Sequence, residues 1–521
     1  MMRRDFIRRV GFGAAGLTCG INTIATPTAG ALKGMNTQLR VAASRFETHA
    51  DIGQYTDGLT GARVETIAGP LKTTVILIED SGERVCLVSS CFYTDSLNVA
   101  VELRKSISQV LGLDQSRILL FSSHNHSTPL LTEGQIYNWD WYGKSPDELP
   151  EVKWLPIGKR FLASLREHLS RLPGALEPAT VWWTEGSEGR ITYNRKGRRA
   201  DGSTYFMREE DRRLVGKDFN GDIDREVPVV VFQGQNGRPV AALLQFTGHP
   251  VTSYHPEKFT VFGDYPLVAS DWLGQALGQG GPVVPVAFLQ GCAGDINSKE
   301  MFEGGVARAR EFGEMLGQSA VDALADLRPS RWHRMDYAEQ IVSIPLAPLP
   351  SRKTLLAEVE EMEDFIRRAD AGDPDTLSCV GLNFPRALSP EYRGALIKAP
   401  LSWNQRALDL YSQGLEKTVM RSLDIPVNVL RLGDAGIVGM PFEPFLGIGR
   451  QMRAKSPFPL TIPCGYVNGT HGYMTDSANT GDREYMSAFY RYTPSRPPFA
   501  RPAGDVVADR AVEILKNFTE A

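Results

Sequence analysis

Two short segments of the chain contain histidines whose spacing suits metal chemistry. Residues 121–127 read Phe-Ser-Ser-His-Asn-His-Ser and residues 247–250 read Thr-Gly-His-Pro, so these segments hold His124, His126 and His249, three of only eight histidines. Imidazole is the commonest metal ligand among side chains, and a catalytic zinc usually takes three protein ligands and leaves one position for water or substrate. The three histidines therefore predict a metal centre, although a lone histidine on an apolar strand is more often a hydrogen-bonded core residue.

The strands that would position these histidines are visible in the sequence. The apolar run Ile118–Phe121 predicts a buried strand. Residues two apart on a strand project from the same face, so His124 and His126 are expected to enter one site at the end of this strand. Residues 228–232 and 240–246 flank an Asn-Gly turn signal and predict a hairpin, with His249 just past its second strand.

The remaining pattern alternates strands and helices. Apolar runs predict further strands at 64–68, 74–78, 85–89, 283–289, 427–431 and 436–440, and helical periodicity predicts helices at 96–104, 355–368, 403–421 and 446–452. The region from about 352 to 422 is charged and helical, so it is expected to be an insert that covers one side of the site. The strand at 283–289 runs into a glycine-rich loop, residues 290–298, of the kind in which enzyme sites are usually assembled.

Composition excludes some classes of partner. The chain has 521 residues, of which 42% are hydrophobic and 23% charged, as in an ordinary globular protein. Its net charge of −4 gives no sign of a nucleic-acid partner, for which a basic surface is expected. After the N-terminus no apolar stretch is long enough to predict a transmembrane segment.

The first 30 residues are typical of an export signal. Arg3 and Arg4 precede the apolar pair Phe6-Ile7, a moderately apolar segment follows, and small residues stand near Gly30. This pattern predicts export by the twin-arginine machinery to the periplasm, with cleavage near Gly30; an uncleaved anchor is the alternative. Five widely scattered cysteines would remain, which do not make a disulfide framework, although one bridge is allowed.

Five segments occur in an order that is similar to a known family. They are His-Asn-His-Ser, Gly-His-Pro, Gly-Cys-Ala-Gly-Asp-Ile-Asn (291–297), Met-Pro-Phe-Glu-Pro (440–444) and Gly-Tyr-Met-Thr (472–475). This series resembles the catalytic domain of the neutral/alkaline ceramidases, zinc-dependent amidases that cleave the N-acyl bond of ceramides. The resemblance covers residues 40 to 495. It implies an α/β fold of mixed β-sheets flanked by helices, with a catalytic domain over residues 31–521 that contains the helical insert.

The resemblance also assigns roles to residues. It implies that zinc is held by four residues: His124, His249, Glu443 and Tyr473. His126 then faces the carbonyl of the substrate, and Tyr490 contacts the reacting oxygen, with Tyr485 as a competing choice because of an insertion before this segment. Arg195 matches an arginine that reaches the site.

The sequence departs from the family in two places. Ceramidases carry a serine in a Gly-Asp-Val-Ser segment, whereas this chain has Asn297 there. An amide cannot form an acyl-enzyme, and Ser298, one place along, would face the other way in extended backbone. Hydrolysis by metal-activated water needs no serine, but ceramide as the substrate becomes doubtful. The immunoglobulin-like C-terminal domain of ceramidases is also expected to be absent.

Three functions follow from these observations. The leading hypothesis is an exported zinc-dependent hydrolase of an amide or related acyl bond. The second is a metal-dependent lyase or hydrolase of carbohydrate, because aromatic residues around the site suit sugars as well as acyl chains: Trp139, Trp141, Tyr142, Tyr254 and Phe262. The third is a non-catalytic binding protein, motivated by Asn297. The expected ligand is a small molecule, lipid or saccharide in each case.

Overall fold

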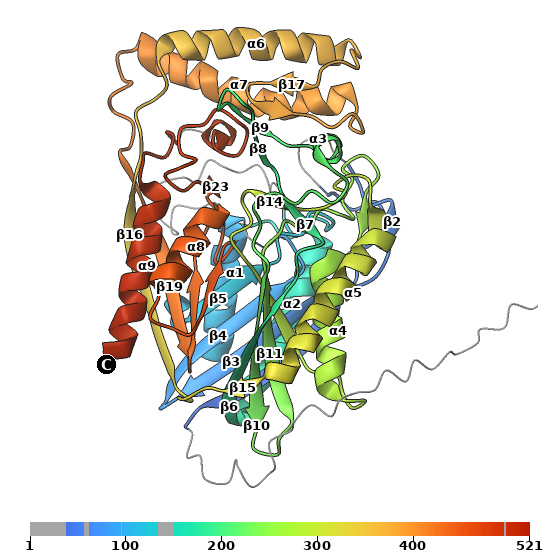
Figure 1. The fold of residues 1–521 in the computed structure, drawn as a ribbon, viewed down its shortest axis with the longest axis vertical. Coiled ribbons are helices and arrows are strands. Elements are labelled where there is room, and N and C mark those ends of the chain that lie inside the picture. Colours follow the sequence, from blue (N-terminus) through green and yellow to red (C-terminus); the bar gives the residue numbers. More distant parts are fainter. Residues whose placement is uncertain (1–37, 57–61, 95, 134–150, 494–495, 521) are drawn as a thin grey trace, which may run out of the picture.

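The architecture is built on one large mixed β-sheet and one smaller sheet (Figure 1). The computed structural model describes residues 38–56, 62–94, 96–133, 151–493 and 496–520. The large sheet has nine strands in this described part, and eight follow the order β13 (Val286–Gln290), β11 (Pro239–Phe246), β10 (Glu226–Gly234), β6 (Glu177–Ser187), β1 (Arg40–Thr48), β3 (Leu71–Asp80), β4 (Glu83–Ser90) and β5 (Ile118–Ser122). The ninth, β15 (Arg328–Pro329), pairs with β6. The smaller sheet has the order β16 (Met335–Pro345), β19 (Ser422–Leu432), β20 (Ala435–Gly439) and β22 (Leu460–Cys464). The predicted α/β fold of mixed sheets is confirmed.

The apolar runs form strands whose two faces are both buried, which explains why apolar residues occupy consecutive positions in them. In β3, Val75 and Leu77 face one core while Ile76 and Ile78 face another, as the two-residue period of a strand requires. The core that contains Ile76 also holds Leu430 of β19, so it fills the space between the two sheets. The predicted hairpin is present, because β10 and β11 pair in antiparallel register around the turn.

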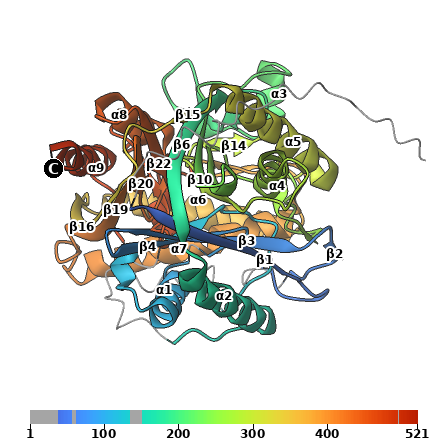
Figure 2. The ribbon, with the colours of Figure 1, turned by 90° about the horizontal axis from the view of Figure 1, so that it is seen from below.

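Helices cover the outer faces of both sheets (Figure 2). Helices α1 (Leu97–Leu111) and α2 (Pro156–Ala175) pack on β1 and β3, α4 (Asp264–Gly278) and α5 (Gly305–Ala323) pack on β10, β11 and β13, and α8 (Leu446–Lys455) and α9 (Ala503–Glu520) pack on the smaller sheet. The short α3 (Glu209–Val215) lies beside the loops of the upper end in Figure 1. Among the described residues, no helix combines the length and apolarity needed to cross a membrane.

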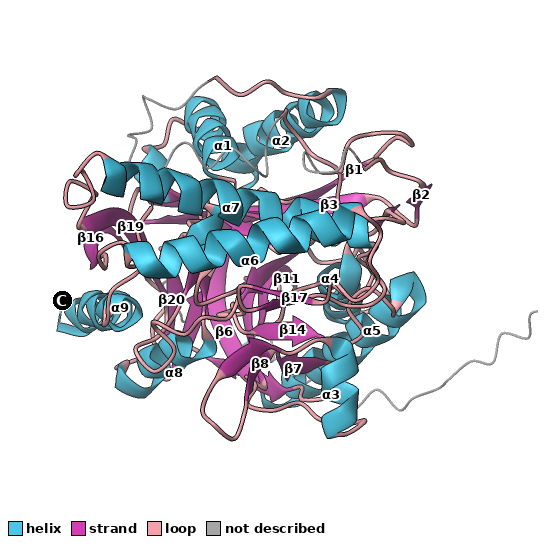
Figure 3. Cartoon of the chain, turned by 90° about the horizontal axis from the view of Figure 1, so that it is seen from above, coloured by secondary structure: helices cyan, strands magenta, loops and turns pink. Residues whose placement is uncertain are grey.

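The predicted insert is a pair of helices. Helices α6 (Arg352–Asp370) and α7 (Pro390–Ser412) pack against each other across the upper end of the molecule (Figure 3). The helix predicted at 403–421 instead begins at Pro390 and ends at Ser412. It begins earlier because proline is favoured in the first turn of a helix, where Pro390 lies, and because α7 accommodates Pro400 in its interior. Apolar residues of both helices share a cluster with Tyr473, so the insert contacts one side of the predicted site.

Short strand pairs link the loops at this end. They are β2 (Thr66–Ile67) with β12 (Thr260–Val261), β7 (Thr192–Asn194) with β14 (Ile296–Ser298), β8 (Lys196–Arg198) with β9 (Thr204–Phe206), β17 (Ser378–Cys379) with β18 (Leu382–Asn383), and β21 (Glu443–Pro444) with β23 (Tyr473–Met474). The five described cysteines are free and buried.

Two predictions from the sequence concern residues outside the described ranges. They are the export signal and the aromatic residues Trp139, Trp141 and Tyr142.

Candidate metal centre

His124 and His126 lie together, but not because a strand continues through them. Strand β5 ends at Ser122, and His124 has a left-handed backbone with φ of 58°. The backbone N–H of His124 donates to Oγ of Ser122 at 3.0 Å, which stabilises this turn. The two imidazole rings lie with centroids 4.8 Å apart. The two histidines therefore enter one site, as predicted. The predicted reason, alternation along a strand, was wrong, because a tight turn after β5 brings the two rings together.

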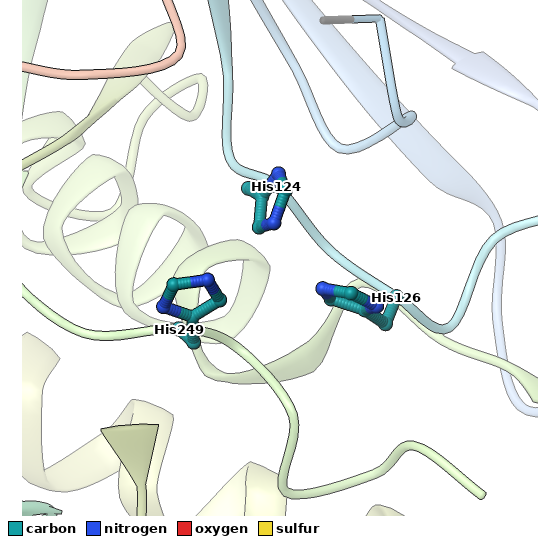
Figure 4. A group of neighbouring side chains, drawn as sticks. All are labelled: His124, His126 and His249. Carbon is teal, nitrogen blue, oxygen red and sulfur yellow. The ribbon is translucent and has the colours of Figure 1, made fainter. Parts of the chain in front are cut away.

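His249 joins this pair from the end of β11 (Figure 4). Its ring centroid lies 4.9 Å from that of His124, and ligand atoms of the three histidines lie within 4.8 Å of one another. Nδ1 of His249 lies 2.6 Å from the carbonyl oxygen of Ala293. A carbonyl only accepts hydrogen bonds, so Nδ1 carries the proton and Nε2 keeps its lone pair, as in metal-ligating histidines.

Glu443 completes a set of convergent donor atoms. Oε2 of Glu443 lies 2.9 Å from Nε2 of His249 and 3.3 Å from Nε2 of His124. Glu443 is only 3% exposed. Burial opposes ionisation of this carboxyl, but the nearby charge and hydrogen bond of His124 lower its pKa below the usual range. The site therefore supplies a buried carboxylate beside two imidazoles.

The chemistry of these donors fits a cation. Burial, followed by the charge of Arg195, lowers the pKa of His249 to about 3, so its imidazole is neutral at neutral pH. With the proton on Nδ1, Nε2 and the Glu443 oxygen would then be two acceptors in direct contact, which is unfavourable without a positive charge between them. Neutral imidazoles and a carboxylate are ligands that zinc prefers.

Tyr473 and Arg195 lie beside the histidines and this carboxylate. Tyr473 is the register partner of Glu443 in the parallel pair β21–β23. Nη2 of Arg195 donates to the Tyr473 hydroxyl at 2.9 Å and lies 3.2 Å from Nε2 of His249, while Nη1 donates to Oδ1 of Asn297 at 2.9 Å. Arg195 is 3% exposed. The structure thus brings Arg195, whose assignment rested on a short match, into contact with three other predicted residues.

Asn297 and Ser298 point in opposite directions, as extended backbone requires. Both lie in β14, where Asn297 contacts Arg195. Oγ of Ser298 instead accepts from the backbone N–H of Val251 at 3.1 Å and from the hydroxyl of Thr252 at 2.8 Å. Ser298 is therefore committed to holding the loop after His249 and does not replace a nucleophilic serine.

The two candidate tyrosines occupy different surroundings. Tyr485 places its ring 5.7 Å from that of Tyr473, beside the donor set. Tyr490 packs on Trp403 of α7 with centroids 4.8 Å apart and belongs to a separate apolar cluster under the insert. Between them the chain turns through η4 (Phe489–Tyr492), which directs Tyr490 away. The geometry thus places Tyr485, and not Tyr490, beside the donor set.

Two aromatic residues that were not assigned a role also line the centre. The Tyr466 ring lies 4.4 Å from the His124 ring, and its hydroxyl lies 3.5 Å from Nε2 of His249. Tyr93 lies 4.9 Å from the His124 ring. Tyr466 stands between glycines 465 and 469, directly after β22. A strand that ends in a glycine-containing loop was thus the sequence signal by which Tyr466 could have been predicted as a site residue. Tyr254, predicted to lie near the site, has its ring 5.2 Å from that of His126.

The fold has the architecture of solved ceramidases. A solved ceramidase in complex with C2 superposes with a TM-score of 0.63 over 93% of this chain and 76% of that chain, at 16% identity. The neutral ceramidase from Pseudomonas aeruginosa gives a TM-score of 0.59 over 93% of this chain and 75% of that chain, also at 16% identity. No protein-family model matches the sequence, and no curated protein matches it significantly. The resemblance found in the sequence motifs is thus confirmed at the level of the fold.

Proposed function

We propose that this chain is an exported zinc-dependent hydrolase of an amide or related acyl bond. The observation that carries the proposal is the convergence of Nε2 of His124 and Nε2 of His249 on one buried oxygen of Glu443. His124, His249 and Glu443 would hold zinc, with the Tyr473 hydroxyl as a fourth donor. Zinc in such a set lowers the pKa of a water ligand and polarises a carbonyl.

His126 is the group available for proton transfer. Its ring lies beside the metal donors, with its centroid 4.8 Å from that of His124 and 6.2 Å from that of His249, whereas the contacts of Glu443 are made by His124 and His249. Burial, then the charge of His124, lowers its pKa well below the usual value, so it is neutral at neutral pH. A neutral imidazole can accept a proton from the attacking water and return it to the amine nitrogen as the C–N bond breaks.

Arg195 orients the groups around the reacting carbonyl. Because it donates to both Tyr473 and Asn297, it fixes their oxygens and keeps a positive charge beside Glu443. Asn297 cannot attack a carbonyl, so the proposed hydrolysis proceeds by attack of water and forms no acyl-enzyme. The ceramidase fold supports an amide as the bond that is cleaved.

The experiment that tests this function is hydrolysis of a panel of N-acyl substrates by the purified protein, before and after chelation and zinc readdition. The proposal expects release of free amine that is lost on chelation and restored by zinc. Full activity after complete removal of metal would refute it. Ultraviolet absorbance from an unsaturated sugar product would favour the lyase, and zinc binding with no turnover of any substrate would favour a binding protein.

A further inference from the structure

A cavity of about 380 Å³ lies where the loop after His249 meets the helical insert. The loop contributes His255, Glu257 and Lys258, and the insert contributes Pro374, residues 386–390 and Arg393. Tyr254, the residue before His255, places its ring 5.2 Å from that of His126. Consecutive residues of one loop therefore flank the histidine cluster and this cavity.

Positive charge predominates in the lining of the cavity. Lys258, Arg386 and Arg393 are cationic, and Glu257 is the one carboxylate among the lining residues. Oε2 of Glu257 already accepts from the backbone N–H of Ser389 at 2.9 Å. Arg386 is an exposed side chain, 3.6 Å from a carboxylate oxygen of the equally exposed Asp375, so solvent screens this pair and it contributes little.

Arg393 has hydrogen-bonding capacity that the described residues do not use. It is only 2% exposed. Nη1 donates to the carbonyl oxygens of Pro374 and Thr376, and Nη2 donates to that of Arg386. Its Nε is buried and has no hydrogen-bond partner in the described part of the chain. The carboxylates of Glu210 and Glu257 act on Arg393 through their charge, but among the described residues its hydrogen-bond acceptors are carbonyl oxygens, and a buried N–H donor without a partner is costly.

We propose that this cavity binds an oxyanion carried by the substrate, so that the hydrolase acts on amides bearing a carboxylate, sulfonate or phosphate. Guanidinium and ammonium groups match these oxyanions in charge and hydrogen-bond geometry. Ceramide itself carries no such group. The inference deepens the proposed function and rests on it for the identity of the ligand as a substrate, whereas binding of an anion can be measured without turnover.

The first test is isothermal titration calorimetry of the zinc-loaded protein with sodium sulfate at constant ionic strength. In the double variant Arg386→Gln/Lys258→Gln, sulfate affinity is expected to fall by about tenfold or more, because two charge-assisted contacts are removed. Arg367→Gln is the control, since Arg367 lies on α6, outside the cavity lining, and its side chain is 75% exposed. Absence of sulfate binding, or equal affinity in the double variant, would overturn the proposal.

The second test compares N-acyl ω-amino acids of increasing length with the matching N-acyl amino alcohols. At one length the acid is expected to have a kcat/KM about tenfold or more above that of the alcohol, and the double variant should abolish the difference. Sulfonate and phosphate analogues then identify the preferred oxyanion. Equal hydrolysis of acids and alcohols at every length overturns the oxyanion site while the hydrolase stands. Sulfate binding that requires Arg386 and Lys258, without hydrolysis of any amide, supports the site and refutes the hydrolase.

Discussion

Glu443 and Tyr473 are direct partners in the parallel pair of β21 and β23, although 30 positions separate them in the chain. This pairing places a carboxylate and a phenol side by side, and the insert supports it because Tyr473 shares an apolar cluster with Met362 and Ile397. The short strand pair thus connects the donor set to the helices that cover it.

Tyr473→Phe removes the hydroxyl that accepts from Arg195. We expect zinc affinity to fall by about 10-fold or more, because loss of a group that only supports a ligand already costs about 10- to 100-fold and this change removes the proposed fourth donor, while the fold is retained because the ring still packs. Competition with a chromophoric chelator measures this change. Tyr490→Phe is the matched control, since Tyr490 packs on Trp403, and an equal loss in both variants would contradict the assignment.

Asn297→Ala tests whether this residue takes part in bond cleavage. We expect kcat/KM to fall by no more than about tenfold, because the change removes one hydrogen bond from Arg195 and no nucleophile. His126→Ala is expected to cost about 10²- to 10⁴-fold through loss of proton transfer. Steady-state kinetics on one N-acyl substrate compares them. Complete inactivation by Asn297→Ala would show that the amide has a chemical role that water attack does not require.

Asp295 should make folding stability depend on pH. Burial raises its pKa to about 6, although the backbone N–H of Leu446 donates to it at 2.8 Å. The folded state therefore binds more protons than the unfolded state between about pH 4 and 6, so this carboxyl lowers stability as pH rises through that range, by up to about 3 kcal/mol.

Asp295→Asn should flatten this part of the stability profile. Urea unfolding at intervals from pH 4 to 7 measures the difference between variant and wild type. Asp218→Asn, at an exposed position, is expected to leave the profile unchanged. A wild-type slope that persists in Asp295→Asn would show that another group causes it.

The export signal can be tested independently of the site. Replacing Arg3 and Arg4 together by lysine should retain the protein in the cytoplasm, because the twin-arginine machinery reads the arginine pair. Fractionation followed by intact-mass measurement gives both compartment and cleavage point, which we expect near Gly30. Export of the double variant at the wild-type level would contradict this route.

The sequence was informative where one strong local signal decides the structure. Runs such as 75–78 and 118–121 are apolar throughout, so they form buried strands in almost any fold. The histidines that follow the second run were recognisable by type and spacing. Strand alternation did not explain why His124 and His126 enter one site, because the left-handed backbone of His124 depends on its contact with Ser122. Local patterns do not specify such turns.

Contacts between distant segments were the least predictable part. Arg195 reaches Tyr473 and Asn297 through the pairing of β7 with β14, and neither strand exceeds three residues. The choice between Tyr485 and Tyr490 depended on how the chain turns through η4 against α7. Tyr466 lies outside the family motifs, and although a glycine loop surrounds it at the end of β22, its role at the site becomes visible through its position against the His124 ring.

The most direct test of the metal centre is zinc content by mass spectrometry of the purified mature protein and three variants. We expect about one zinc per chain in the wild type and its loss in His124→Ala and His249→Ala, since each removes one ligand of a site that needs three or four. His49→Ala, at an exposed side chain, should retain the metal. A wild type without zinc, or full zinc in either ligand variant, would contradict the account.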